Sequence, residues 1–358
     1  MYTARYLSER AKETTSENCR CKKCLDLPRR TMSTDSKPKV LPTYLQTDYG
    51  FLIPNMFSLE ALQSAIDYTP RDDDLFIVTY PKCGTTWVQN IVACIYRKGR
   101  PFESAIEFLT STPFLEMAGA EAARTMKRPG AIKLHLPFRV TPWSDKAKYI
   151  FVTRNPKDCC VSFYHHTKNV FAYMFQNGEF DDYFELFMEG KVDFGDYYDT
   201  LLSWYEHRND PNVLFITYEQ LKKDTTLYIM KIAEFMGEQY KTMLEGDPEM
   251  LANVIRYSSF DYMKQTLNSQ LAQLAKLPKD FVANHPDIPP GLKNILTVGT
   301  EDKPFFNSDP NALTLVRKGV VGDWKNHLSP DQNRRMEERF RERTKGTDIP
   351  ELWKDIMQ

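Results

Sequence analysis

The chain has 358 residues, of which 42% are hydrophobic and 27% are charged, a composition typical of a globular enzyme with a sizeable core. Its 47 basic and 48 acidic side chains nearly cancel, which excludes a general attraction to nucleic acid or to an anionic membrane. No apolar run reaches the roughly 18–20 residues that span a bilayer. We therefore expect a cytoplasmic protein whose anion-binding groups, if any, are gathered locally.

Residues 1–40 are polar and charged and show no periodicity, which predicts a flexible N-terminal extension. A single domain is expected over residues 41–358. The extension contains three of the seven cysteines as CRCKKC at 19–24. Because no fourth cysteine or histidine lies nearby, this cluster predicts a reduced tail rather than a zinc site.

Strands alternate with helices in the next part of the chain. Buried strands are expected at 75–80, 148–153 and 213–217, and helices at 85–96, at 156–175 and from 218 to about 236. Since parallel strands need crossover connections, this order predicts an α/β fold with a parallel sheet covered on both faces. Residues 266–312 contain several Pro, Gly and Asn and predict a long loop.

The segment between the first strand and its helix, PKCGTT at 81–86, has the properties of an anion site. The first amides of a helix are unpaired and lie at the positive end of the helix dipole. Gly84 lets the backbone approach an anion, Lys82 adds a full charge, and Thr85 and Thr86 add hydroxyl donors. This is not a Walker A loop, because the lysine precedes the only glycine. A shorter loop of this kind suits one 5′-phosphate with its attached group.

The sequence YPKCGTTW at 80–87 resembles the 5′-phosphosulfate loop of the cytosolic sulfotransferases, which generally have Ser where this chain has Cys83. Three further segments resemble the same family in the same order: KLHLP at 133–137, RNPKDCCVSFYHH at 154–166 and RKGVVGDWK at 317–325. The resemblance extends over about residues 43–345. It implies a P-loop-like α/β domain, 3′-phosphoadenosine 5′-phosphosulfate (PAPS) as the cofactor, a small-molecule acceptor and no metal.

The resemblance also implies which residues hold the cofactor. The 5′ end would lie on Lys82, Cys83, Gly84, Thr85 and Thr86. The 3′-phosphate would be bound by Arg154, Ser162, Arg317, Lys318 and Gly319, which offer a planar guanidinium, charge and short donors. The adenine would contact Trp87, Tyr218, Ser258, Phe260 and Met263, the last three in YSSFDYMK. Core packing is the competing explanation for Trp87 and Phe260.

Three residues are candidates for catalysis. His135 stands in KLHLP, where the family has KTHLP, and is the candidate general base that would remove a proton from the acceptor hydroxyl. Lys82 would stabilise the leaving phosphate oxygen, and Lys133 would stabilise the sulfuryl oxygens.

The acceptor side is expected to contain Phe57, Phe114, Met117, Lys133, His135 and His166. Phenol-handling relatives often have Phe where this chain has His166, so we hypothesise a more polar pocket that favours an acceptor with a second polar group, such as a catechol or a phenolic amine. The expected acceptor is a phenol or a catecholamine-like compound. A hydroxysteroid or another alcohol is the alternative acceptor. The 266–312 segment is expected to act as a lid over this end.

Other readings stay open at this level. A P-loop nucleotide kinase would need a Walker A glycine pattern, which is absent. A related binding protein without catalysis would not need His135, Lys82 and Lys133 together. The family dimer segment is altered here to KNHLSPDQNR at 325–334, where Pro330 removes a backbone donor. Arg334 also reverses a charge there. Dimerisation through this segment is therefore not expected, and the protein is expected to be a monomer or a dimer formed in another way.

Overall fold

The computed structural model describes residues 39–298 and 315–357. The extension predicted for residues 1–40, including its CRCKKC cluster, lies outside the described residues except for its last two positions. Its boundary with the domain therefore stays a prediction.

The centre of the domain is a parallel sheet of four strands in the order β4-β3-β5-β6. The strands are β3 (Leu75–Thr79), β4 (Ile132–Leu134), β5 (Lys148–Thr153) and β6 (Val213–Thr217). The α/β fold and the three strands expected from the sequence are confirmed. The short strand β4 was not expected, because three residues are too few to show a periodic pattern.

Both faces of the sheet are buried. Phe76 and Val78 of β3 pack into one hydrophobic cluster, whereas Leu75 and Ile77 pack into another on the opposite face. Alternate side chains of a strand point to opposite faces, so a strand covered on both sides must be apolar throughout. This explains the continuous apolar run of β3, whose five residues are all buried.

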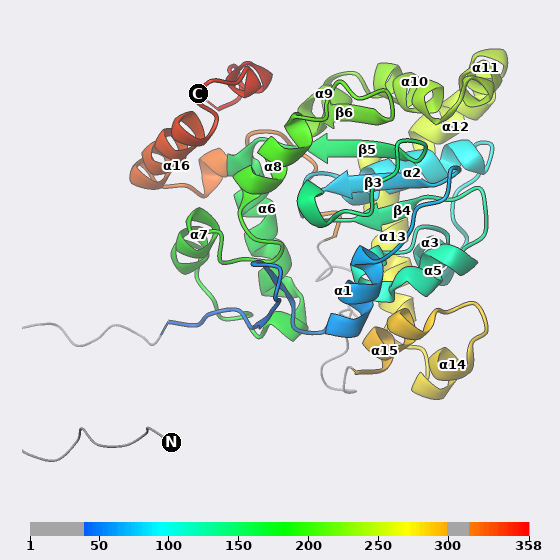
Figure 1. Cartoon of the computed structure of the whole chain (residues 1–358), viewed down its shortest axis with the longest axis horizontal. Coiled ribbons are helices and arrows are strands. Elements are labelled where there is room, and N and C mark those ends of the chain that lie inside the picture. The colour runs from blue at the N-terminus through cyan, green and yellow to red at the C-terminus, as the bar shows by residue number, and fades with distance from the viewer. Residues whose placement is uncertain (1–38, 299–314, 358) are drawn as a thin grey trace, which may run out of the picture. The chain divides into compact units, whose positions relative to one another are not determined.

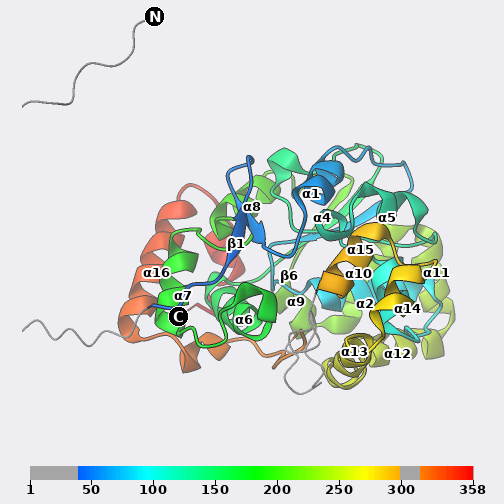
Figure 2. The same cartoon turned by 90° about the horizontal axis from the view of Figure 1, so that it is seen from below.

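Helices cover the two faces and the ends of the sheet (Figures 1 and 2). They are α1 (Leu59–Ile66), α2 (Thr85–Tyr96), α3 (Ala105–Ser111), α4 (Leu115–Ala118), α5 (Ala120–Thr125), α6 (Pro156–Asn169), α7 (Phe180–Met188), α8 (Tyr197–Tyr205), α9 (Tyr218–Lys223), α10 (Thr225–Met236), α11 (Glu238–Gly246), α12 (Pro248–Tyr257), α13 (Phe260–Leu274), α14 (Lys279–Asn284), α15 (Pro290–Val298) and α16 (Pro330–Arg343). A two-stranded antiparallel ribbon, β1 (Tyr44–Gln46) with β2 (Leu52–Pro54), lies outside the main sheet. None of the helices in the described ranges combines the length and apolarity needed to cross a bilayer.

The helix expected over 156–175 ends earlier, at Asn169. Val170 is extended, and a short 3₁₀ turn at Phe171–Tyr173 follows, ending in the left-handed conformation of Met174. This turn brings Tyr173 into the interior, where it is 2% exposed.

The loop predicted for residues 266–312 is wrong over 266–298. This part of the chain contains the end of α13 and all of α14 and α15. Leu267, Leu271 and Leu274 are buried at spacings of four and three, which is the period of a helix face. Pro278 precedes the first residue of α14, and Pro290 is the first residue of α15. Residues 299–312 lie outside the described residues.

The altered dimer segment forms the start of α16. Ser329 caps the helix in a capping box with Gln332, and Pro330 takes the first helical position, where a missing N–H costs nothing.

Candidate active site

Candidate residues directly follow each of the four parallel strands. Lys82 follows β3, His135 follows β4, Arg154 follows β5 and Tyr218 follows β6. The carboxyl ends of parallel strands lie at one edge of a sheet, where α/β proteins bind their ligands. The parallel order therefore gathers side chains from four distant parts of the sequence at one edge.

A large cavity lies at this edge, and its wall contains nearly all the residues expected from the sequence. These are Phe57, Lys82, Gly84, Thr85, Thr86, Trp87, Phe114, Met117, Lys133, His135, Arg154, Ser162, His166, Tyr218, Phe260, Met263, Arg317, Lys318 and Gly319.

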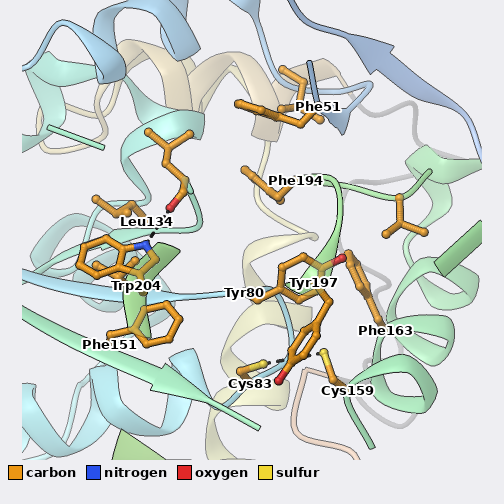
Figure 3. Close-up of a cluster of buried hydrophobic side chains, with 14 of the residues drawn as sticks. Phe51, Tyr80, Cys83, Leu134, Phe151, Cys159, Phe163, Phe194, Tyr197 and Trp204 are labelled. Atoms are coloured by element: carbon orange, nitrogen blue, oxygen red, sulfur yellow. Dashed lines mark hydrogen bonds between the residues drawn. The ribbon is translucent and has the colours of Figure 1, made fainter. Parts of the chain in front are cut away.

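Two expected residues, Cys83 and Ser258, do not line the cavity. The Cys83 thiol is buried under the loop, with its sulfur 3.7 Å from that of Cys159 on α6 (Figure 3). The Ser258 hydroxyl donates instead to the Val254 carbonyl at 2.7 Å, at the end of α12. Any cofactor contact of these two residues would have to come from the backbone.

The start of α2 is open toward the cavity. Gly84 precedes the helix with φ 109°, and no side chain caps the helix amides. A Cβ at Gly84 would lie 3.0 Å from the Tyr218 ring and would require the left-handed conformation. Glycine therefore keeps the uncapped amides accessible to an anion.

His135 is held in a defined orientation. Its Nδ1 lies 2.7 Å from the Thr79 carbonyl oxygen, which can only accept, so we infer that Nδ1 bears the proton. Nε2 is then the basic nitrogen of the ring. Burial, followed by the charge of Lys133, lowers the pKa of His135 well below its usual value, so the ring is neutral near pH 7 and able to accept a proton.

Six cationic side chains line the cavity, those of Lys82, Lys133, Arg154, Lys222, Arg317 and Lys318. Burial, followed by the charges of Lys133, Arg154 and Arg317, lowers the pKa of Lys82 to about 7. Burial likewise lowers the pKa of Lys133 to about 8. Neighbouring positive charges that depress the protonation of Lys82 form a site that favours a polyanion.

Three basic side chains of the cavity wall, those of Arg154, Arg317 and Lys318, are only partly neutralised by the protein. Arg154 donates to the Val320 carbonyl at 2.9 Å and lies 3.6 Å from Asp158, while its Nε has no hydrogen-bond partner among the described residues. Arg317 and Lys318 are both held by Asp323, at 2.6 and 2.7 Å. This arrangement orients three cations and leaves donor capacity for a phosphate.

Three aromatic rings, those of Trp87, Tyr218 and Phe260, also line the cavity. Trp87 and Tyr218 meet edge to face with centroids 5.4 Å apart, and the Trp87 indole N–H has no partner within the described residues. A Cβ at Gly319 would lie 2.3 Å from the Phe260 ring, so glycine is needed for Phe260 to reach the cavity. Flat rings with a free donor suit a purine.

The opposite end of the cavity is aromatic around His135. The Phe114 ring lies 4.9 Å from the His135 ring and 5.3 Å from the Phe57 ring. The Lys133 ammonium lies 3.7 Å from the Phe114 ring centre. The His166 ring lies 6.0 Å from that of Tyr173. The candidate base His135, the Lys133 ammonium and the apolar slot of Phe57 and Phe114 therefore lie at the same end of the cavity.

Several residues at this end were missed from the sequence. Tyr173, Asp193 and Phe194 line the cavity, and the Glu116 carboxylate accepts a hydrogen bond from the His135 backbone amide. Burial raises the pKa of Glu116 to about 7. Phe194 has φ 60° beside Gly195, so the Phe-Gly pair was a faint turn signal. Tyr173, Asp193 and Glu116 stand in no local sequence pattern that would have identified them as site residues.

Comparison with known proteins agrees with this geometry. The sulfotransferase domain family matches residues 72–284 and 302–348. The amine sulfotransferase of Oryctolagus cuniculus is 32% identical over 324 residues, covering 89% of this chain and 95% of its own length. Human sulfotransferase 1C2 is 32% identical over 293 residues, covering 79% of this chain and 86% of its own.

A solved structure is also similar. Mouse sulfotransferase SULT7A1, in complex with PAP, aligns with a TM-score of 0.63 and 29% identity, over 87% of this chain and 98% of that chain. The chain described here belongs to the sulfotransferase family. It is a sulfotransferase with a P-loop-like α/β fold, and the family expected from its four motifs is confirmed.

Proposed function

We propose that the protein moves the sulfuryl group of PAPS to a hydroxyl or amine of a small acceptor, a phenol or a catecholamine-like compound, in the cytoplasm. The observation that supports this most directly is the hydrogen bond from His135 Nδ1 to the Thr79 carbonyl at 2.7 Å. It leaves Nε2 as a neutral base beside the aromatic slot of Phe114. An acceptor proton must leave as its oxygen attacks, and a positioned imidazole can take it.

The cavity residues fit the expected cofactor. The uncapped start of α2, the unpaired Nε of Arg154 and the free Trp87 indole N–H are donors without partners among the described residues, and each matches a phosphate or purine group. The related mouse sulfotransferase was solved with PAP. Lys82, Gly84, Thr85 and Thr86 would hold the 5′ end, while Arg154, Ser162, Arg317, Lys318 and Gly319 would hold the 3′-phosphate.

The cofactor, when bound, supplies the sulfuryl group. In this chain His135 would accept the acceptor proton at Nε2, Lys82 would stabilise the charge left on the phosphate, and Lys133 would stabilise the sulfuryl oxygens. The expectation that no metal is needed stays a prediction.

The acceptor would occupy the slot of Phe57, Phe114 and Met117, with His166 making its far end more polar. A hydroxysteroid or alcohol acceptor is the alternative. Whether the protein works as a monomer or as a dimer is a separate question; the altered 325–334 segment argues against the usual family route to a dimer.

The base assignment is tested by measuring sulfation of phenols, catecholamines, hydroxysteroids and alcohols with PAPS. We expect the highest kcat/KM for phenols and catecholamines. In the His135→Ala variant, kcat should fall by about 10²–10⁴-fold, the usual contribution of general base catalysis, while PAP affinity stays close to that of the wild type. Near-full turnover by this variant would show that His135 is not the base.

A further inference from the structure

Asp193 is a buried carboxylate in the wall of the acceptor end. It lies between α7 and α8, pairs with Leu52 of β2 in a parallel bridge, and is 1% exposed. Neighbouring residues of an extended chain point to opposite sides. Here Phe194 is left-handed, with its amide donating to the Leu52 carbonyl at 2.7 Å, and both Asp193 and Phe194 line the cavity.

Its partners within the protein are few. One oxygen, Oδ2, accepts a hydrogen bond from the Tyr173 hydroxyl, and the other, Oδ1, has no partner among the described residues. No lysine or arginine in the described ranges forms an ion pair with it. Burial, only partly offset by the Tyr173 hydrogen bond, raises the pKa of Asp193 to about 8.

Two other buried carboxylates of the domain, Asp74 and Asp323, are compensated more fully. Asp74 is the nearest match, because it is also 1% exposed and also accepts from a tyrosine, Tyr68, at 2.7 Å. In addition, Asp74 forms an ion pair with Arg128 at 2.7 Å. Asp323 has two cations, Arg317 and Lys318. A buried carboxylate without such a cation is costly, and the cavity beside Asp193 can admit one.

Asp193 is also close to the chemistry. The ring of the adjacent Phe194 lies 5.3 Å from the His135 ring and 6.3 Å from the Phe114 ring. Tyr173, which binds the carboxylate, lies beside His166. An acceptor whose hydroxyl faces His135 would extend along Phe194 toward Asp193.

We propose that Asp193, oriented by Tyr173, binds a protonated amine of the acceptor, so that the preferred substrates are hydroxylated compounds carrying a cationic ammonium group. This deepens the proposed function and rests on it. Hydrogen bonds to charged groups are the stronger ones, and here the ammonium would supply the cation that the protein lacks.

The test compares tyramine with 4-ethylphenol, which differ by the ammonium group. In the wild type with PAP bound, calorimetry should give a Kd for tyramine at least roughly tenfold lower than for 4-ethylphenol. Asp193→Asn keeps the side-chain size and can still accept from Tyr173. It should lower the ratio of kcat/KM values, tyramine over 4-ethylphenol, by about tenfold or more through KM, and Asp193→Glu should restore part of it.

Asp74→Asn is the matched control, because it removes a buried, tyrosine-bound carboxylate outside the cavity. It should lower the melting temperature without changing the ratio. Equal wild-type affinity for the two compounds, or a ratio within twofold of wild type in Asp193→Asn, would overturn the inference while leaving sulfation of phenols intact. If the wild type binds PAP but sulfates neither compound, the proposed acceptor class fails, and this inference fails with it.

Discussion

At the scale of single residues, the site depends on charged groups that the fold holds in partly neutral forms. Lys82 is half-buried among Lys133, Arg154 and Arg317, and its pKa is lowered to about 7. Lysine in the unfolded chain would keep its proton to far higher pH. Near pH 8 the folded site therefore binds fewer protons than the unfolded chain. A bound anion would raise the pKa of Lys82 and return the proton to it.

We expect PAP binding at pH 8 to take up protons, because the bound phosphates raise the pKa of Lys82. By the same linkage, PAP affinity should fall as pH rises from about 7 to 9, since free Lys82 loses a proton that it must regain. Calorimetry in two buffers of different ionisation enthalpy measures the uptake. Lys82→Arg, which stays charged, should still bind PAP but with less proton uptake; unchanged uptake would assign the effect to another group.

Cys83 and Cys159, the two cysteines beneath the 81–86 loop, are a second feature at the scale of single residues. Cys83 replaces the serine typical of the family, and its sulfur meets that of Cys159 in an apolar interior (Figure 3). Burial raises the pKa of Cys83 well above its usual value, so the thiol is expected to be inert.

At the scale of elements, α15 lies in the segment for which the sequence predicted a loop. It packs against α4, whose Met117 lines the cavity. The contact is tight: a Cβ at Gly291 would lie 2.6 Å from the Ala118 carbonyl oxygen. Leu292 and Ile295 are buried behind it. We propose that this helical segment, rather than a loop, covers the acceptor.

Gly291→Ala should therefore displace α15 from α4. We expect the acceptor KM to rise severalfold, because the wall around Met117 shifts, with little change in PAP affinity. Gly246→Ala is a suitable control, since it adds a methyl group to a helix, α11, with no atom within 4 Å. Steady-state kinetics and PAP titration measure the two effects; an equal loss of acceptor and PAP binding would argue against a cover over the acceptor.

At the scale of the whole molecule, nucleotide binding should stabilise the domain, because both ends of the cofactor site join segments distant in sequence. Ligand at about 100 times its Kd adds about 2.7 kcal/mol to the free energy of unfolding. We expect PAP to raise the melting temperature by several degrees and ATP with magnesium to raise it much less. The reverse preference would favour a nucleotide kinase over PAPS-dependent sulfuryl transfer.

Much of this architecture could be predicted from the sequence. Strands β3, β5 and β6 are short apolar runs bounded by polar residues, and the start of α2 has the Lys-Cys-Gly-Thr pattern of an anion loop; these are local signals that need no partner. Helix α13 was missed although its leucines are helically spaced, because the prolines and asparagines that follow it suggested a loop. Strand β4 was missed because it is held by its neighbour β3 rather than by its own pattern.

The sequence by itself determined the family, and it was enough to propose the cofactor-binding segments and His135 as the candidate base, because each of these is written in contiguous residues whose chemistry is local. Only the tertiary structure gave the contact from which we infer the His135 proton on Nδ1, and only it showed that the Cys83 and Ser258 side chains do not line the cavity. It also showed that Asp193 lines the cavity with no cation paired to it among the described residues. These properties depend on groups that the parallel sheet brings together from distant segments, namely the Thr79 carbonyl, helices α6 and α12, and the Asp193 carboxylate. Burial sets the energies of the polar groups among them.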